Sequence, residues 1–143
     1  MTSDKRRFKR ISVEIPVKVY FGDNKGKKRL GEPLEGRIHN FSPCGAALTV
    51  ATILLNGRHL FYTCQDSPDI RLELVFEFSG KEQTVINVPA APVWFDRDLD
   101  SEKKQFVVGL EFLMPAKSKE IKSLCREACQ DETMLLSLWK KLF

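Results

Sequence analysis

Alternation of apolar and polar residues dominates the first 113 residues of the chain. Every second residue is apolar from residue 11 to 21, again from 70 to 78, and again from 105 to 113. A two-residue period puts successive side chains on opposite faces of a strand, so it is typical of a β-strand with one buried face. We therefore predict a strand in each of these three segments.

Turn residues separate these strands from further ones. Residues 22–31 (GDNKGKKRLG) are rich in glycine and basic residues and predict a loop, after which residues 34–41 resume as a short strand. Residues 79–82 (SGKE) turn the chain into another strand over residues 84–88. Each of these turns implies a hairpin.

Two prolines interrupt the stretch that follows. Because Pro89 and Pro92 lack a backbone N–H, we expect a sheet edge or a β-bulge there before the strand resumes at residues 93–95. At least five strands are thus predicted before any clear helix. Several short strands with turns between them favour a sandwich or a closed barrel, and a barrel leaves no long unpaired edge.

Past Pro115 the apolar period changes from two residues to three or four, which predicts one long helix or two short ones with a break at Asp131-Glu132. The stripe has two interpretations. It is either the seam of a coiled-coil dimer with Asp131 as a polar intruder, or a face that docks on the chain's own barrel. We favour docking, because the stripe is wide and a desolvated aspartate would be costly. Its members are Ile121, Leu124, Cys125, Ala128, Met134, Leu135, Leu138, Trp139 and Leu142.

Length and composition limit the possibilities. A chain of 143 residues that is 43% hydrophobic can bury one core, so we expect one domain with an appendage. It contains no run of about 18 apolar residues and no apolar stretch after the charged start, which argues against membrane insertion and a signal peptide and favours a cytoplasmic location. Its four cysteines form no CxxC pair, so no zinc site or disulfide framework is expected.

The net charge is concentrated at the start of the chain. Residues 1–10 hold five basic side chains and one acidic one, whereas the remaining residues hold 18 of each sign. A basic arm on a neutral body suits a compact anion or a phosphate backbone. The alternative is an ordinary solvated terminus.

One short motif precedes the first predicted strand, and another follows the second. Arg6 and Arg10 form RxxxR directly before the first strand, and Asn40, Ser42 and Gly45 fit [DN]xSxxG at the end of the second. In this order the pair resembles the signature of the PilZ family, and the resemblance continues through residues 45–48, 93–94 and 108–112. It covers roughly residues 5–113 and leaves the C-terminal segment outside.

This resemblance implies a mainly β fold, a six-stranded antiparallel PilZ-type β-barrel with a C-terminal helical appendage. It divides the chain into a flexible arm (1–10), a barrel (11–114) and a helix or helix pair (115–143). It also implies that cyclic di-GMP, a bacterial second messenger, lies between the arm and one barrel face. The candidate nucleotide-binding residues are Arg6, Arg7, Arg10, Asn40, Ser42 and Gly45.

The chemistry of this ligand suits those residue types. A guanidinium can meet a phosphate or the O6/N7 edge of guanine with two parallel hydrogen bonds, which lysine does less well. Asn40 and Ser42 offer short polar groups, and Gly45 allows a close approach or an unusual backbone angle. We expect an arm that orders over the ligand and thereby signals to an unidentified downstream protein, as an adaptor without a cofactor.

Catalytic and metal sites have little support. His39 and His59 each precede a cysteine by five residues, but no nucleophile, phosphate-loop or metal-ligand signature is present. We expect no enzyme and no metal. Two alternatives remain: a barrel that binds single-stranded nucleic acid, which the core-facing aromatics disfavour, and a PilZ-like barrel that acts through protein contacts alone.

Overall fold

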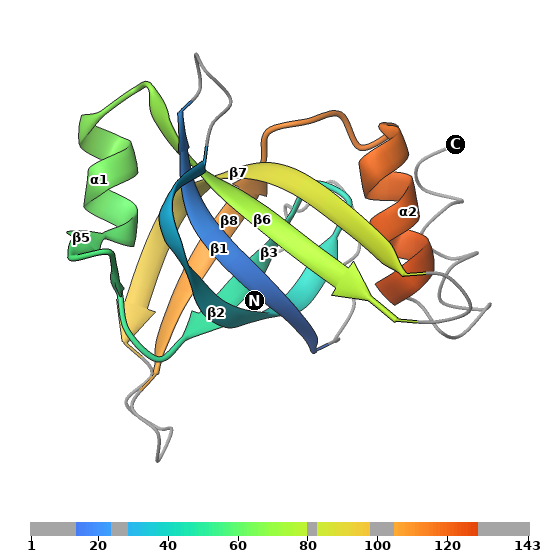
Figure 1. Cartoon of the computed structure of the whole chain (residues 1–143), viewed down its shortest axis with the longest axis horizontal. Coiled ribbons are helices and arrows are strands. Elements are labelled where there is room, and N and C mark those ends of the chain that lie inside the picture. Colours follow the sequence, from blue (N-terminus) through green and yellow to red (C-terminus); the bar gives the residue numbers. More distant parts are fainter. Residues whose placement is uncertain (1–13, 24–28, 80–82, 98–104, 129–143) are drawn as a thin grey trace, which may run out of the picture.

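Six strands close into an antiparallel barrel in the order β1-β2-β3-β8-β7-β6, with β6 pairing back to β1 (Figure 1). The structure is a computed structural model that describes residues 14–23, 29–79, 83–97 and 105–128. The barrel strands are β1 (Ile15–Asp23), β2 (Arg29–Ser42), β3 (Gly45–Val50), β6 (Ile70–Phe78), β7 (Thr84–Arg97) and β8 (Phe106–Phe112). The predicted six-stranded antiparallel barrel is confirmed.

Alternating side chains fill the barrel. On β1, Val17, Val19 and Phe21 are at most 4% exposed, while their neighbours face outward. The same alternation buries Leu72, Leu74 and Phe76 on β6 and Val108, Leu110 and Phe112 on β8. All these residues belong to a single hydrophobic core, so the two-residue period of the sequence identifies the inward face correctly.

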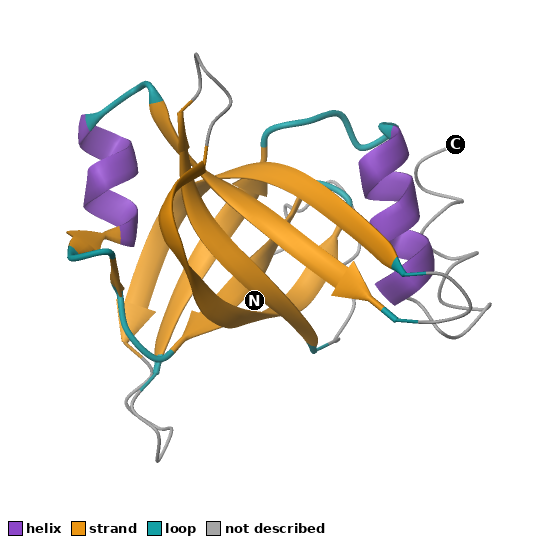
Figure 2. Cartoon of the chain, in the orientation of Figure 1, coloured by secondary structure: helices purple, strands orange, loops and turns teal. Residues whose placement is uncertain are grey.

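Two helices cover opposite sides of the barrel (Figures 1 and 2). Helix α1 (Leu60–Asp66) follows a small hairpin of β4 (Leu54–Leu55) and β5 (Arg58–His59), whose two turn residues, Asn56 and Gly57, both have positive φ. This Asn-Gly pair is the usual sequence of a tight hairpin turn. Helix α2 (Lys119–Ala128) follows β8, and each helix adds at least one fully buried side chain to the barrel core.

Two sequence predictions about the strands need correction. The loop predicted over residues 22–31 is too long, because Gly22 and Arg29 are already paired across β1 and β2. The strand predicted from residue 84 to 88 continues as β7 to Arg97 through both prolines, with a register shift between Pro92 and Trp94. The bulge expected at the prolines is confirmed, and Pro92 has a strand partner on one side only, because β7 pairs with β6 as far as Ala90 and with β8 from Ala90 onward.

Five strands do precede the first helix, but that helix, α1, was not predicted from the sequence and lies between β5 and β6. A helix of seven residues is too short for the apolar period to reveal it. It forms here because Leu60 is buried in the core and because the His59 imidazole accepts hydrogen bonds from the first free backbone N–H groups of the helix.

The C-terminal stripe docks on its own barrel as far as the structure describes it. Ile121, Leu124 and Cys125 of α2 are completely buried in the same core as the strands. The predicted break at residues 131–132 and the remaining stripe residues lie outside the described part of the chain. None of the helices in the described ranges combines the length and the apolar character needed to cross a membrane.

Candidate functional site

The [DN]xSxxG residues lie together in the hairpin that joins β2 to β3. Asn40 is exposed and has a φ of 48°, a left-handed conformation that asparagine tolerates better than most residues. The register between the two strands shifts between His39 and Ser42. This irregularity turns the Asn40 side chain outward, whereas the neighbouring Phe41 stays in the core.

The Ser42 hydroxyl is used inside the hairpin. Its Oγ donates to the Gly45 carbonyl and accepts from the Cys44 backbone N–H, each over 3.3 Å, and the residue is 4% exposed. The Cys44 carbonyl in turn accepts a hydrogen bond from the Phe112 N–H. Ser42 thus holds the turn in shape and anchors it beside β8.

Gly45 is required by a close approach of two backbones. A β-carbon at this position would lie 2.2 Å from the carbonyl oxygen of Leu110 on β8. The φ of Gly45 is not positive, so the close approach of the two backbones, and not an unusual backbone angle, explains this glycine. Any side chain would push the hairpin away from β8.

A row of outward-facing residues crosses the barrel beside this hairpin. His39 on β2 pairs with Ala47 on β3, Ala47 pairs with Gly109 on β8, and Gly109 pairs with Trp94 on β7. Trp94 is 46% exposed, and its indole fills the space that a side chain at Gly109 would need, with Nε1 2.1 Å from the position of a β-carbon. The row therefore places an imidazole and an indole on either side of two small residues.

Both rings of this row are available to a ligand. Within the part of the chain that the structure describes, neither the His39 imidazole nor the Trp94 indole N–H has a hydrogen-bonding partner. Sequence reasoning noted Trp94 as part of a family-like strand but not as a site residue. An exposed tryptophan on a strand was the available signal, since exposed tryptophans are typical of binding surfaces.

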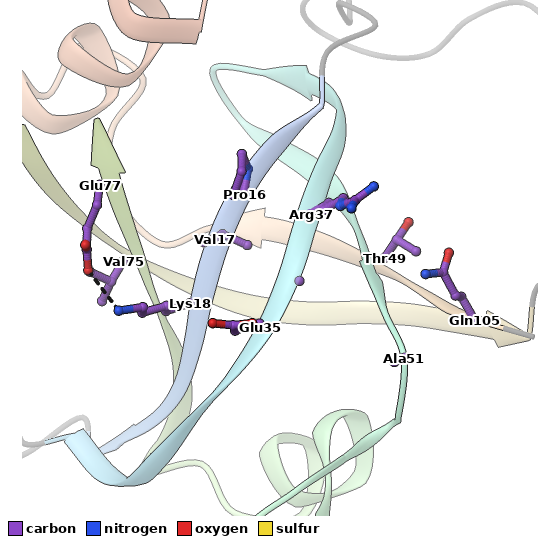
Figure 3. A pocket seen from close by; sticks show the side chains of 11 residues that line it. Pro16, Val17, Lys18, Glu35, Arg37, Thr49, Ala51, Val75, Glu77 and Gln105 are labelled. Carbon is purple, nitrogen blue, oxygen red and sulfur yellow. Dashed lines mark ion pairs between the residues drawn. The ribbon is translucent and has the colours of Figure 1, made fainter. Parts of the chain in front are cut away.

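A shallow cavity of about 460 Å³ adjoins the row on the outer face of β1, β2, β3 and β6 (Figure 3). Arg37 and Thr49 line it, and they are the outward-facing neighbours of His39 and Ala47 on the same strands. The other lining residues are Pro16, Val17, Lys18, Glu35, Gly36, Ala51, Val75, Glu77 and Gln105. The four row residues do not line the cavity themselves, so the row and the cavity are neighbouring features of the same outer face.

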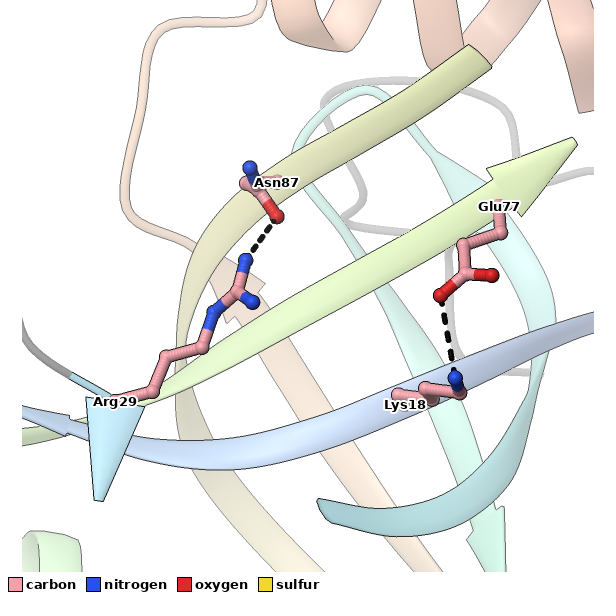
Figure 4. A network of polar contacts seen from close by, with 4 residues as sticks. All are labelled: Lys18, Arg29, Glu77 and Asn87. Atoms are coloured by element: carbon pink, nitrogen blue, oxygen red, sulfur yellow. Dashed lines mark hydrogen bonds and ion pairs between the residues drawn. The ribbon is translucent and has the colours of Figure 1, made fainter. Parts of the chain in front are cut away.

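The positive charges around this cavity are already neutralised. The Lys18 ammonium lies 3.2 Å from the Glu77 carboxylate (Figures 3 and 4). The Arg37 guanidinium is paired with the Glu14 carboxylate. Figure 4 also shows Arg29 of β2 donating to the Asn87 side chain of β7 over 2.7 Å, across β1 and β6. The outer barrel face is therefore polar, and its cations are held by neighbouring groups.

The predicted site residues divide into two groups. The hairpin residues Asn40, Ser42 and Gly45 are brought together, whereas Arg6, Arg7 and Arg10 lie outside the described residues.

His59 and Cys64 lack the features of an activated Cys–His pair. His59 Nδ1 accepts from the Phe61 and Tyr62 backbone N–H groups, and burial raises the pKa of the Cys64 thiol to about 12, which keeps it protonated. In the described ranges, His, Cys, Asp and Glu side chains do not gather in a group of three or more that could hold a metal ion.

Comparison with known proteins gives a consistent result. The family model described as the PilZ domain matches residues 4–127. Among solved structures, the fold resembles the PilZ domain with c-di-GMP of YcgR from Escherichia coli, with a TM-score of 0.50 and 12% sequence identity over 97% of this chain and 95% of that one. At this identity the likeness shows the fold. No curated protein sequence matches the chain.

Proposed function

The chain belongs to the PilZ domain family, and from this premise we propose that it is a receptor that binds cyclic di-GMP and performs no reaction on it. The observation that carries the proposal is the outer-face row beside the signature hairpin. Trp94 offers an exposed aromatic face there, and Gly109 has no side chain to displace the indole that rests on it. The solved PilZ domain of YcgR, which contains c-di-GMP, supports the same ligand for this fold.

A guanine of the ligand is proposed to stack on Trp94. Every base offers a π-face, and stacking of one base on an aromatic side chain contributes about 1–3 kcal/mol. Asn40 projects outward from the hairpin on the same side of the sheet and is proposed to meet a guanine edge with its amide. Ser42 and Gly45 are proposed to act indirectly, by keeping the hairpin close to β8.

The phosphates need positive charge from another source. Because Lys18 and Arg37 are each paired with a glutamate, the described face has little uncompensated positive charge to offer a dianion. We therefore assign the phosphates and the remaining guanine edges to Arg6, Arg7 and Arg10 of the basic arm. These ion pairs on the barrel face support an arrangement in which the arm contributes the positive charge that the phosphates need and the barrel contributes the surface on which the bases lie.

Ordering of the arm is the proposed signal. Fixing each arm residue costs about 1–2 kcal/mol of backbone entropy, so ligand contacts are required to hold the arm in place. The closed arm would present a new surface to a downstream protein, which makes the chain an adaptor in second-messenger signalling.

A titration with three ligands tests the proposal. Cyclic di-GMP, GTP and a short single-stranded oligonucleotide are each titrated into the full chain by calorimetry at the same two salt concentrations, one low and one high. We expect saturable binding of cyclic di-GMP at a much lower concentration than of GTP or the oligonucleotide. Tighter binding of the oligonucleotide with a steep salt dependence would favour the nucleic-acid alternative. Absence of binding to all three would favour a barrel that acts through protein contacts alone.

A further inference from the structure

His39 occupies a distinctive position at the candidate site. It directly precedes Asn40 of the signature hairpin and faces outward, while its neighbours Ile38 and Phe41 are completely buried. The residue is half-buried and stands opposite Ala47, at the end of the row that begins with Trp94. None of the sequence motifs includes it.

The imidazole of His39 has no partner of its own among the described residues. The charged groups nearest to it on this face are Arg37 on β2, Glu14 before β1, and Glu111 on β8 opposite Gly45. Arg37 and Glu14 pair with each other. Strand β3 contributes no titratable side chain, and the Cys44 thiol lies in the adjoining turn. Among the described residues, His39 is thus a half-buried donor without a hydrogen-bonding partner, and it lies on the same outer face as Trp94.

We propose that His39 donates a hydrogen bond to a phosphate of the bound ligand and takes up a proton as the ligand binds, so that affinity increases as the pH falls. The inference rests on the proposed function and adds a ligand-contacting residue and a proton linkage to it. Trp94 and Asn40 would contact the guanines, whereas His39 would donate a hydrogen bond to the phosphate between them.

The direction of the effect follows from charge. A phosphate beside an imidazole favours the protonated form, so the complex binds a proton more tightly than the free protein does. Binding is then strongest where the imidazole is charged and loses this contribution as the pH rises through the histidine range. The phosphodiesters of the ligand stay ionised throughout this range, so the proton that is taken up from solution is bound by the protein and not by the ligand.

Calorimetric titration of cyclic di-GMP into the full chain tests the inference at about pH 5.5 and about pH 8, on either side of the histidine range. A further titration at about pH 7 is carried out in two buffers of different ionisation enthalpy, because the number of protons taken up is largest where a histidine is only partly charged. For the wild type we expect about fivefold tighter binding at about pH 5.5 than at about pH 8, the effect of one exposed charge pair, together with a net proton uptake at about pH 7.

Two variants make the test specific to His39. His39→Gln keeps a hydrogen-bonding side chain that does not titrate, so it should bind like the wild type at about pH 8 and show neither the gain in affinity at about pH 5.5 nor the proton uptake at about pH 7. His59 is the other histidine of the chain and lies at α1, so His59→Asn should retain the full pH dependence of binding.

The outcomes separate the two proposals. If cyclic di-GMP binds and both the gain in affinity and the proton uptake persist in His39→Gln, the role of His39 is wrong while the proposed function stands. Binding that is equally tight at both pH values in the wild type has the same meaning. If the wild type does not bind cyclic di-GMP at either pH, the proposed function itself fails.

Discussion

The indole of Trp94 lies in the space that Gly109 leaves empty on the neighbouring strand. A β-carbon at Gly109 would come within 2.1 Å of the indole Nε1, so the ring can rest on the barrel wall because residue 109 has no side chain. The glycine thus sets the position of an exposed aromatic ring beside the signature hairpin. The stacking proposal can therefore be tested by substituting either Trp94 or Gly109.

Replacing either residue should weaken ligand binding. Trp94→Ala removes the stacking surface, and we expect a loss of about 1–3 kcal/mol, roughly 5-fold to 150-fold in affinity. Gly109→Ala keeps the tryptophan but displaces its ring, so calorimetry should show a loss in the same direction. Val85→Ala is the matched control, because Val85 is also an exposed apolar residue of β7. Equal affinity of Trp94→Ala and Val85→Ala would contradict stacking.

Arg6→Ala and Arg10→Ala should each lower affinity for cyclic di-GMP at least about tenfold, since a bidentate contact to guanine contributes about 1–3 kcal/mol. The melting temperature should not change, because their proposed contacts are with the ligand. Lys9→Ala removes the same charge from the same segment and should have a smaller effect, as should Arg7→Ala. Wild-type affinity in the Arg6, Arg10 double variant would show that the site is misassigned.

Variants of the β2–β3 hairpin should distinguish loss of the turn's conformation from loss of a direct contact with the ligand. Asn40→Gly removes the amide but suits the left-handed backbone, so we expect weaker binding with unchanged or increased stability. Ser42→Ala removes two hydrogen bonds inside the turn and should lower the free energy of unfolding by about 1 kcal/mol as well as affinity. Binding that survives the double change, measured beside urea unfolding, would leave the arm as a non-specific anion trap.

Stability should fall in mild acid because of His59. Burial lowers the pKa of this imidazole, and its Nδ1 must stay unprotonated to accept from the first N–H groups of α1. A histidine with a lowered pKa in the folded state contributes stability above its unfolded pKa of about 6.5 and loses it as the pH falls through the folded value. Urea unfolding at several pH values measures this loss.

His59→Asn is the control for that experiment. Asparagine is a strong N-cap that does not titrate, so this variant should lose less stability than the wild type between neutral and mildly acidic pH. His59→Ala should cost about 1 kcal/mol at neutral pH as an ordinary cap loss. An unchanged acid dependence in His59→Asn would place the responsible group elsewhere.

Removing α2 should expose barrel surface. A chain ending at Pro115 lacks three completely buried side chains, so we expect an aggregating or destabilised protein. Ile121→Ala in the full chain should cost about 2–5 kcal/mol in thermal or urea unfolding, whereas exposed Glu127→Ala should cost little. The full chain should sediment as a monomer. A stable full-length dimer, with a well-behaved truncated monomer that still binds ligand, would assign the helix to oligomerisation.

The sequence predicted the elements whose signal is local. Strands β1, β6 and β8 have one buried face, so their alternation could be read directly. The stripe of α2 was visible for the same reason at the helical period. Strand β3 shows no alternation, because both Ala46 and Ala47 are buried along with Leu48, and its place in the barrel came from the family resemblance.

Part of the candidate site could be predicted from the sequence, again because its signal is local. Asn40, Ser42 and Gly45 are close in sequence, so a short motif could reveal them, although it could not show that the Ser42 hydroxyl bonds within the turn or that Gly45 avoids Leu110. Helix α1 could not be predicted from the sequence, because the residue that caps it and the Phe95 ring that it packs against both lie outside its seven residues.

Tertiary structure alone decided which residues share the outer face. His39, Ala47, Gly109 and Trp94 are spread over 71 positions of the sequence, from residue 39 to residue 109, and meet because β2, β3, β8 and β7 pair in that order and register. Periodicity determines which way a side chain points, since it depends on the backbone of one strand. Adjacency across strands depends on how the barrel closes, because a single-residue slip in register would move each side chain to the other face.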